Sequence, residues 1–180
     1  LFATVGLHRT TMETIAASAG RGRRTIYMYF SNKSEIYEAV VESELNRIIK
    51  PLGDATASAD SFELVLRHYT EERIRLLNEL ANRNPLLLKD FALGMSRVEK
   101  LRERLFNEEM KIIMPFFRRH AEEMDHASGT STEDYALIFL NMLRGSDRLL
   151  TRQNGYERDR HLSLASANLF IKGLGFRPVT

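Results

Sequence analysis

Arginine, threonine and tyrosine side chains are concentrated in one short stretch near the start of the chain. Three arginines fall within four positions, at Arg21, Arg23 and Arg24. Hydroxyl-bearing residues follow them at Thr25, Tyr27 and Tyr29. Guanidinium groups pair with phosphate or carboxylate oxygens, and these hydroxyls can donate hydrogen bonds to the same oxygens. The stretch therefore carries the chemistry of an anion-binding surface.

Charge is unevenly distributed along the chain. The 180 residues have a formal net charge of only +2. Between Leu1 and Ser34, however, five residues are basic and one is acidic, whereas the remainder has 21 basic and 23 acidic residues. A basic end on a nearly neutral body favours nucleic acid as the anion, and a solvated basic face is the alternative interpretation.

A short helix is expected to precede the arginines, over Met12–Ala19. Its apolar residues recur at i, i+3, i+4 and i+7. Gly20 is expected to end it, because glycine adopts the left-handed conformation without a Cβ clash. Two N-caps are possible: Thr10, which forms a Thr-x-x-Glu capping box with Glu13, or Thr11.

A second short helix is expected over Arg23–Phe30. Ile26 and Phe30 lie four residues apart and can be buried together. The residues turned outward would then be Arg24, Thr25 and Met28. Two eight-residue helices joined by a glycine turn form the layout of a helix-turn-helix unit, whose second helix lies in the major groove of DNA.

The sequence from Phe2 to Val40 resembles the TetR family of bacterial transcriptional repressors. The resemblance is carried by "F…VG…TTMETIAASAG…TIYMYFSNKSEIYEAV". The positions that match the family pattern are Phe2, Gly6, Thr10-Thr11, Ile15-Ala16, Ala19-Gly20, Thr25, Tyr27, Phe30 and Lys33. Beyond about Ser43 the resemblance is to architecture alone.

This resemblance implies how the unit would hold DNA. Thr11 would cap the first helix of the unit and touch a phosphate. The positions that typically hold the DNA backbone are Thr25, Tyr27, Tyr29 and Lys33. The positions that vary with the operator, and so would read bases, are Arg23, Arg24 and Met28.

Two residues depart from the family pattern. Arg21 stands where a small apolar residue usually packs under the turn, and we expect it to extend outward and add a phosphate contact. Gly22 replaces the usual serine-like cap and supplies no side-chain acceptor, so a looser turn is expected.

The remaining pattern predicts an all-α fold of about nine helices, the first of which lacks its beginning and ends near Val5. A fourth helix would begin at Asn32 and end at Pro51, followed by a loop over Gly53–Ser61. Further helices are expected over Phe62–Ala81, Pro85–Met95, Ser96–Met124 (with a kink at Pro115), Glu133–Leu150 and Arg158–Phe176. The helix-turn-helix DNA-binding domain would span residues 1–48, and a helical effector-binding and dimerisation domain residues 49–180.

Two further sites are expected in that second domain. Side chains on its central helices could line a pocket for a small molecule, although aromatic residues and methionine at helical spacing also suit a plain core: Arg67, His68, Tyr69, Phe91, Met95 and Phe117. The resemblance implies that the last two helices form a four-helix bundle with those of a second copy. Their apolar faces include Leu137, Leu140, Leu143, Leu164, Leu169 and Phe170.

Several classes of site find no support in the sequence. Cysteine is absent, the five histidines are scattered, and neither a nucleophile elbow nor a phosphate loop occurs. We therefore expect no metal, no cofactor and no catalytic activity. No apolar run approaches the length of a membrane span, and we expect a cytoplasmic protein with no membrane partner.

The leading hypothesis is a homodimeric transcriptional repressor that binds a palindromic double-stranded DNA operator and is released by a small, largely apolar effector. The alternative is a TetR-like architectural or cell-division DNA-binding protein controlled by a protein partner. A third reading, an enzyme on a borrowed scaffold, lacks any catalytic constellation.

Overall fold

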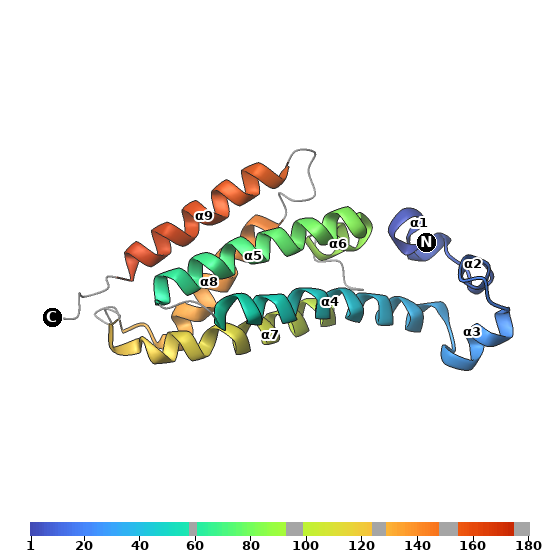
Figure 1. The fold of residues 1–180 in the computed structure, drawn as a ribbon, viewed down its shortest axis with the longest axis horizontal. Coiled ribbons are helices and arrows are strands. Elements are labelled where there is room, and N and C mark those ends of the chain that lie inside the picture. Colours follow the sequence, from blue (N-terminus) through green and yellow to red (C-terminus); the bar gives the residue numbers. More distant parts are fainter. Residues whose placement is uncertain (58–60, 93–98, 124–128, 148–154, 175–180) are drawn as a thin grey trace.

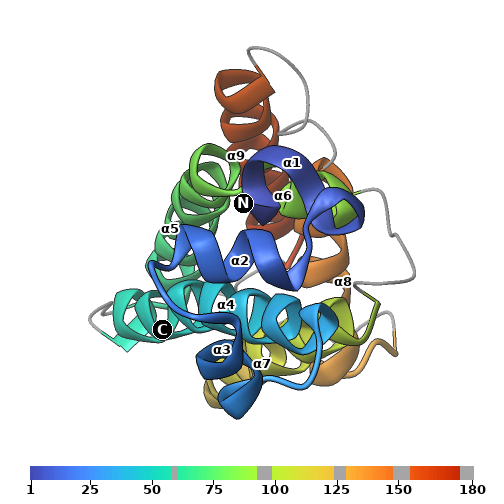
Figure 2. The same cartoon turned by 90° about the vertical axis from the view of Figure 1, so that its right-hand side faces the viewer.

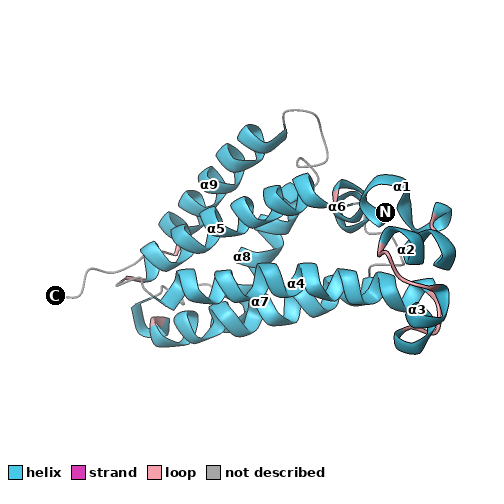
Figure 3. Cartoon of the chain, turned by 45° about the vertical axis from the view of Figure 1, so that its right-hand side comes forward, coloured by secondary structure: helices cyan, strands magenta, loops and turns pink. Residues whose placement is uncertain are grey.

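The computed structural model describes all residues except 58–60, 93–98, 124–128, 148–154 and 175–180. Within the described residues the secondary structure is helical throughout (Figure 3). The α-helices are α1 (Phe2–Arg9), α2 (Met12–Ser18), α3 (Arg23–Tyr29), α4 (Lys33–Ala57), α5 (Phe62–Arg83), α6 (Pro85–Ala92), α7 (Glu99–Arg119), α8 (Thr132–Ser146) and α9 (Gly155–Gly173). A 3-10 turn, Ala121–Glu123, follows α7. The all-α prediction is confirmed.

The first three helices form a small head at one end of the molecule, and the remaining helices form an elongated body (Figure 1). Helix α4 begins in the head and extends far into the body, beside α5 and α7. Its buried side chains recur every three or four residues, so one stripe of the helix faces the core: Tyr37, Val41, Leu45, Ile48 and Leu52. This one helix therefore joins the two parts.

Helix α4 is longer than the sequence indicated. It passes through Pro51 and ends at Ala57, so the predicted end at Pro51 and the predicted loop from Gly53 are wrong. Leu52 is fully buried directly after the proline. The Thr56 hydroxyl, also buried, donates to the carbonyl oxygens of Leu52 and Gly53 at 3.2 and 2.9 Å. Burial of this last turn outweighs the hydrogen bond that proline cannot donate.

Helix α1 contains a break at Gly6. That residue has φ 79° and ψ 166°, which is not helical, so a separate turn containing Leu7 follows. The prediction that the first helix ends near Val5 is confirmed. The break at Gly6 also positions the link between α1 and α2, because the Thr10 hydroxyl in that link donates to the Gly6 carbonyl at 2.8 Å.

The body has an aromatic core between α5, α7, α8 and α9. Phe62 and Phe117 meet edge to face with ring centroids 4.9 Å apart, and Phe139 and Phe170 lie 5.3 Å apart. Pro115 lies inside α7, which ends at Arg119 rather than continuing as one helix to Met124. The observed ends of α8 and α9 differ from the predicted ends by a few residues, as is common for helix termini.

A charged cluster is buried beside this core. The Arg73 guanidinium donates to Glu109 at 2.7 Å and to both oxygens of Asp147 at 2.7 and 3.0 Å. The Tyr69 hydroxyl donates to the same Glu109 oxygen at 2.9 Å, and the second oxygen, Oε2, has no hydrogen-bond partner in the described residues. Because one guanidinium ties together α5, α7 and the end of α8, the cluster fixes how these helices pack.

Candidate nucleic-acid interface

The turn between α2 and α3 closes as the sequence predicts. Gly20 has φ 61°, the left-handed conformation that glycine adopts without strain. The Gly20 and Arg21 amides donate to the carbonyls of Ala17 and Ala16 at 3.1 and 2.9 Å, which is the Schellman pattern of a helix C-terminus. The turn therefore sets the angle at which α3 leaves α2.

Thr11 is the N-cap of α2. Its hydroxyl accepts from the Thr14 amide at 3.2 Å, and the Thr14 hydroxyl accepts from the Thr11 amide at 2.9 Å. Of the two caps left open by the sequence, the Thr11 cap is thus confirmed. Thr10 instead points back to α1 and is fully buried.

Helix α3 is held to the head by few apolar contacts. Ile26 and Phe30 of α3 are half-buried, whereas Met12 and Ala16 of the neighbouring α2 are buried. Gly22 is the N-cap of α3 and forms no side-chain hydrogen bond there, as expected. In the end-on view of Figure 2, α2 and α3 lie at the front of the head.

The outward surface of this unit collects most of the residues that the sequence singled out. Met28 and Tyr29 expose 76% and 73% of their surface, unusual for large apolar or aromatic side chains in the absence of a partner. Tyr27 is exposed and Thr25 half-buried. The three arginines of the unit are exposed as well: Arg21, Arg23 and Arg24.

Arg23 is held in place by two neighbours. Its guanidinium pairs with Glu13 of α2 at 2.8 Å and lies over the Tyr27 ring, 5.3 Å from the centroid. An exposed pair of this kind contributes little free energy, so a phosphate or a base edge can replace Glu13. The sequence pattern predicts only a capping role for Glu13. In the structure Glu13 instead orients Arg23.

Lys33 lies differently from the sequence prediction. Its ammonium donates to three carbonyl oxygens at the end of α1, those of Leu7 at 3.0 Å, Thr10 at 3.1 Å and His8 at 3.4 Å. An ammonium has three protons to donate, and all three have acceptors. In this structure Lys33 thus links the start of α4 to the end of α1, and its predicted phosphate contact stays a prediction.

The comparisons with known proteins agree with this geometry. Residues 1–40 match the family model described as bacterial regulatory proteins, tetR family. Residues 1–40 therefore form a DNA-binding domain of the TetR family. With this domain the chain is a DNA-binding transcriptional regulator and not an enzyme.

Proteins similar to this chain match it over most of their length. An uncharacterized HTH-type transcriptional regulator of Bacillus subtilis (strain 168), YfiR, is 24% identical over 148 residues, which cover 81% of this chain and 72% of that protein. A transcriptional regulator from Cytophaga hutchinsonii ATCC 33406 has a TM-score of 0.74 at 22% identity, covering 95% of this chain and 91% of that one. The fatty acid degradation regulator FadR from Bacillus halodurans has a TM-score of 0.71 at 17% identity, covering 98% and 91%. The structural likenesses show a shared fold.

Of the residues expected to line an effector pocket, those that the structure describes lie in different surroundings. Tyr69 and Phe117 are fully buried, the first in the Arg73 cluster and the second in the aromatic core. Arg67 pairs with Glu63 at 2.8 Å, and His68 is exposed in an open groove beside α9. Met95 and the side chain of Phe91 lie outside the described residues.

The residues expected at a dimer interface fall into two groups. Leu140 and Leu143 are buried within the subunit, which corrects their placement: they belong to its own core. The others remain partly or largely exposed: Leu137, Leu164, Leu169 and Phe170. Ile138 and Leu162, which the sequence prediction omitted, are 50% and 40% exposed.

The described residues contain neither a cluster of metal ligands nor a membrane-spanning helix. No group of three or more acidic or histidine side chains in that part of the chain could hold a metal ion. Among the same residues, no helix combines the length and the apolar character that crossing a bilayer requires.

Proposed function

We propose that the chain is a homodimeric repressor that presents α3 to successive major grooves of a palindromic operator and loses DNA affinity when a small molecule binds. The observation that carries the DNA-binding part is the exposed surface of α3, with two arginines and two large side chains, Met28 and Tyr29, on a fixed helix-turn-helix. The half-sites of a two-fold dimer would lie about 34–36 Å apart, one turn of the double helix.

Sequence readout is assigned to Arg24 first. It is exposed and has no ion pair with another described residue, so its guanidinium can donate to a guanine edge. Thr25 and Tyr27 would fix the register on the phosphates. Arg23 can join either set once DNA replaces Glu13.

Selection of bound DNA from a random pool tests this assignment. The intact chain should enrich a palindrome. Arg24→Ala should relax the preference at one position of each half-site by about 1–3 kcal/mol. Lys50→Ala is the matched control, because Lys50 is an exposed cation of α4 at the end remote from α3. A selected sequence unchanged by Arg24→Ala would refute the role of Arg24.

The dimer is supported by an apolar strip on α8 and α9. Ile138, Leu162 and Leu169 are exposed, and the apolar residues next to them are half-buried. Such side chains on two neighbouring helices fit a partner with the same strip. Sedimentation should give a dimer for the intact chain and a monomer for Ile138→Glu with Leu169→Glu. Leu64→Glu, which changes an exposed leucine of α5, should leave the dimer intact.

Release by an effector requires a ligand that distinguishes two arrangements of the subunits. Helix α4 supports this part of the proposal, because it runs unbroken from the head into the body. Measuring operator affinity against a library of small molecules tests it. A regulator that responds to none of them but to a protein from the same cell would favour the alternative of a protein partner.

A further inference from the structure

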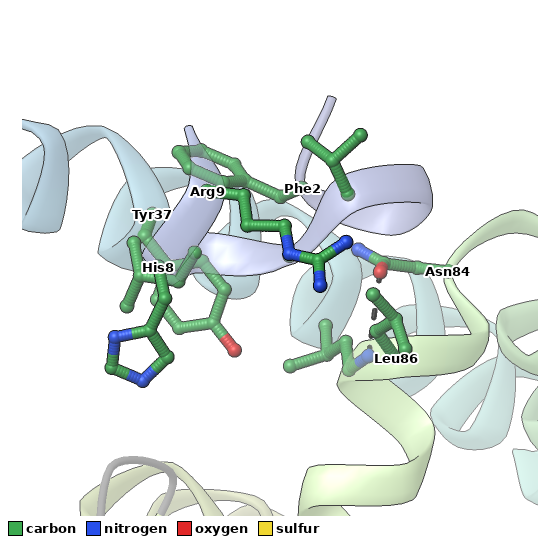
Figure 4. Close-up of a pocket in the computed structure, with 10 residues that line it drawn as sticks. Phe2, His8, Arg9, Tyr37, Asn84 and Leu86 are labelled. Atoms are coloured by element: carbon green, nitrogen blue, oxygen red, sulfur yellow. Dashed lines mark hydrogen bonds between the residues drawn. The ribbon is translucent and has the colours of Figure 1, made fainter. Parts of the chain in front are cut away.

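A cavity of about 230 Å³ lies where the head meets the body, between α1, α4 and α6 (Figure 4). Its apolar lining includes Phe2, Val5, Leu7, Leu86 and Leu87. Phe2 and Tyr37 form one wall, with their rings edge to face at 5.3 Å. The volume corresponds to about eight liquid water molecules. It suits a small organic molecule.

The polar groups at this cavity carry positive charge or donate hydrogen bonds. Its lining contains Arg9 and His8 and no acidic residue. Figure 4 shows the Arg9 side chain extending across the cavity toward Asn84. In the described part of the chain Arg9 has no carboxylate partner. A small anion would supply one.

Asn84 supplies a second donor. The residue is only 5% exposed, and its side-chain oxygen accepts from the Leu87 amide at 3.4 Å, at the start of α6. Its amide nitrogen has no acceptor among the described residues, and Figure 4 shows that nitrogen directed toward Arg9. Arg9 and Asn84 thus present donors from the two sides of the cavity, as a planar carboxylate requires.

We propose that this cavity binds a small carboxylic acid, with its carboxylate on Arg9 and Asn84 and its apolar part against Phe2 and Leu86. The occupant touches α1 of the head and α6 of the body at once. The two helices already approach closely here: a Cβ added to Gly6 would lie 3.5 Å from Leu86 Cδ1. A bound acid therefore fixes the head relative to the body. Its effect on DNA rests on the function proposed above, whereas its binding does not.

Binding is tested on the whole chain without DNA, by calorimetry with benzoate and hexanoate at millimolar concentration, a range suited to ligands of this size. Benzamide, the uncharged counterpart of benzoate, is the ligand control. At least one acid should bind, and benzamide should bind at least tenfold more weakly. Arg9→Gln should abolish acid binding, and Leu86→Trp, which fills the cavity, should do the same. Arg47→Gln, at an exposed arginine of α4 outside the cavity, should leave binding unchanged.

Three results would overturn the proposal: no binding of either acid, equal binding of benzoate and benzamide, or equal binding to the intact chain and Arg9→Gln. Thermal unfolding of each variant without ligand identifies a variant that has lost its fold. If Arg9→Gln is such a variant, Arg9→Lys replaces it. Arg9→Lys should bind the acid more weakly than the intact chain, because lysine cannot pair with a carboxylate through two parallel hydrogen bonds. DNA affinity is measured separately with saturating acid. Binding of the acid without a change in DNA affinity supports the site and refutes its role as the effector site.

Discussion

Replacing Lys33 by methionine distinguishes a residue that positions the head from one that holds phosphate. The substitution keeps an unbranched side chain, one atom shorter, but removes the three hydrogen bonds to the end of α1. The bonds to Leu7 and Thr10, at 3.0 and 3.1 Å, are partly buried, whereas the bond to His8 is exposed at 3.4 Å and water can replace it. At about 1–1.5 kcal/mol for each of the two buried bonds, Lys33→Met should lower the free energy of unfolding by about 2–3 kcal/mol.

Two measurements check this expectation. Urea denaturation of the free protein should show the lost stability, and hydrogen exchange should show faster opening of the α1 amides. A salt titration on DNA should show weaker binding with the same slope of log affinity against log salt. A phosphate contact would instead lower that slope by about 0.9. Lys50→Met, at an exposed lysine of the same helix, should change neither quantity. An unchanged unfolding free energy together with a reduced slope would refute the positioning role.

Other predictions concern the body and the turn. Asp159 is buried, and this burial raises its pKa from 3.8 to about 6, so the folded state binds its proton more tightly than the unfolded state. The free energy of unfolding should therefore fall as pH rises from about 4 to about 6. Asp159→Asn should remove this fall and stabilise the chain at pH 7 by about 2–3 kcal/mol. Urea denaturation at a series of pH values measures both effects. Arg73→Met leaves Glu109 and Asp147 buried without their cation and should cost about 3–5 kcal/mol; a loss below 1 kcal/mol would show that water reaches the cluster. Gly20→Ala forces alanine to adopt a left-handed conformation and should lower the free energy of unfolding by about 1–2 kcal/mol. The cost comes from the backbone alone, because the added Cβ would meet no atom within 4 Å. An unchanged melting temperature would mean that the turn relaxes.

The head could be predicted from sequence because local chemistry fixes most of it. The glycine turn after α2 and the break of α1 at Gly6 each depend on residues a few positions apart, so a pattern along the chain reveals them. The exposure of Met28 and Tyr29 follows from the period of a short helix whose inner face is set by Ile26 and Phe30.

Contacts between residues distant in sequence could not be predicted. Lys33 meets the end of α1 across more than 20 positions, and Arg73 meets Asp147 across 74. The local sequence around Lys33 indicates only a phosphate contact, because its acceptors on α1 lie far away along the chain. Pro51 locally favours a helix end, and the burial of Leu52, which depends on the packing of other helices, outweighs that preference. In the same way, the junction cavity depends on Arg9 and Asn84, which no local pattern connects.

Helix α4 can act as a lever between the body and the head, because it is one continuous helix. Its 25 residues, at about 1.5 Å each, make a rod about 37 Å long with Lys33 at one end and Ala57 at the other. A tilt of only about 5° around the Ala57 end displaces the Lys33 end by about 3 Å, close to the rise of one base pair, about 3.4 Å. In a symmetric pair the two displacements add. A change in the body no larger than a side-chain rearrangement can thus shift the spacing of two recognition helices by more than a base-pair step.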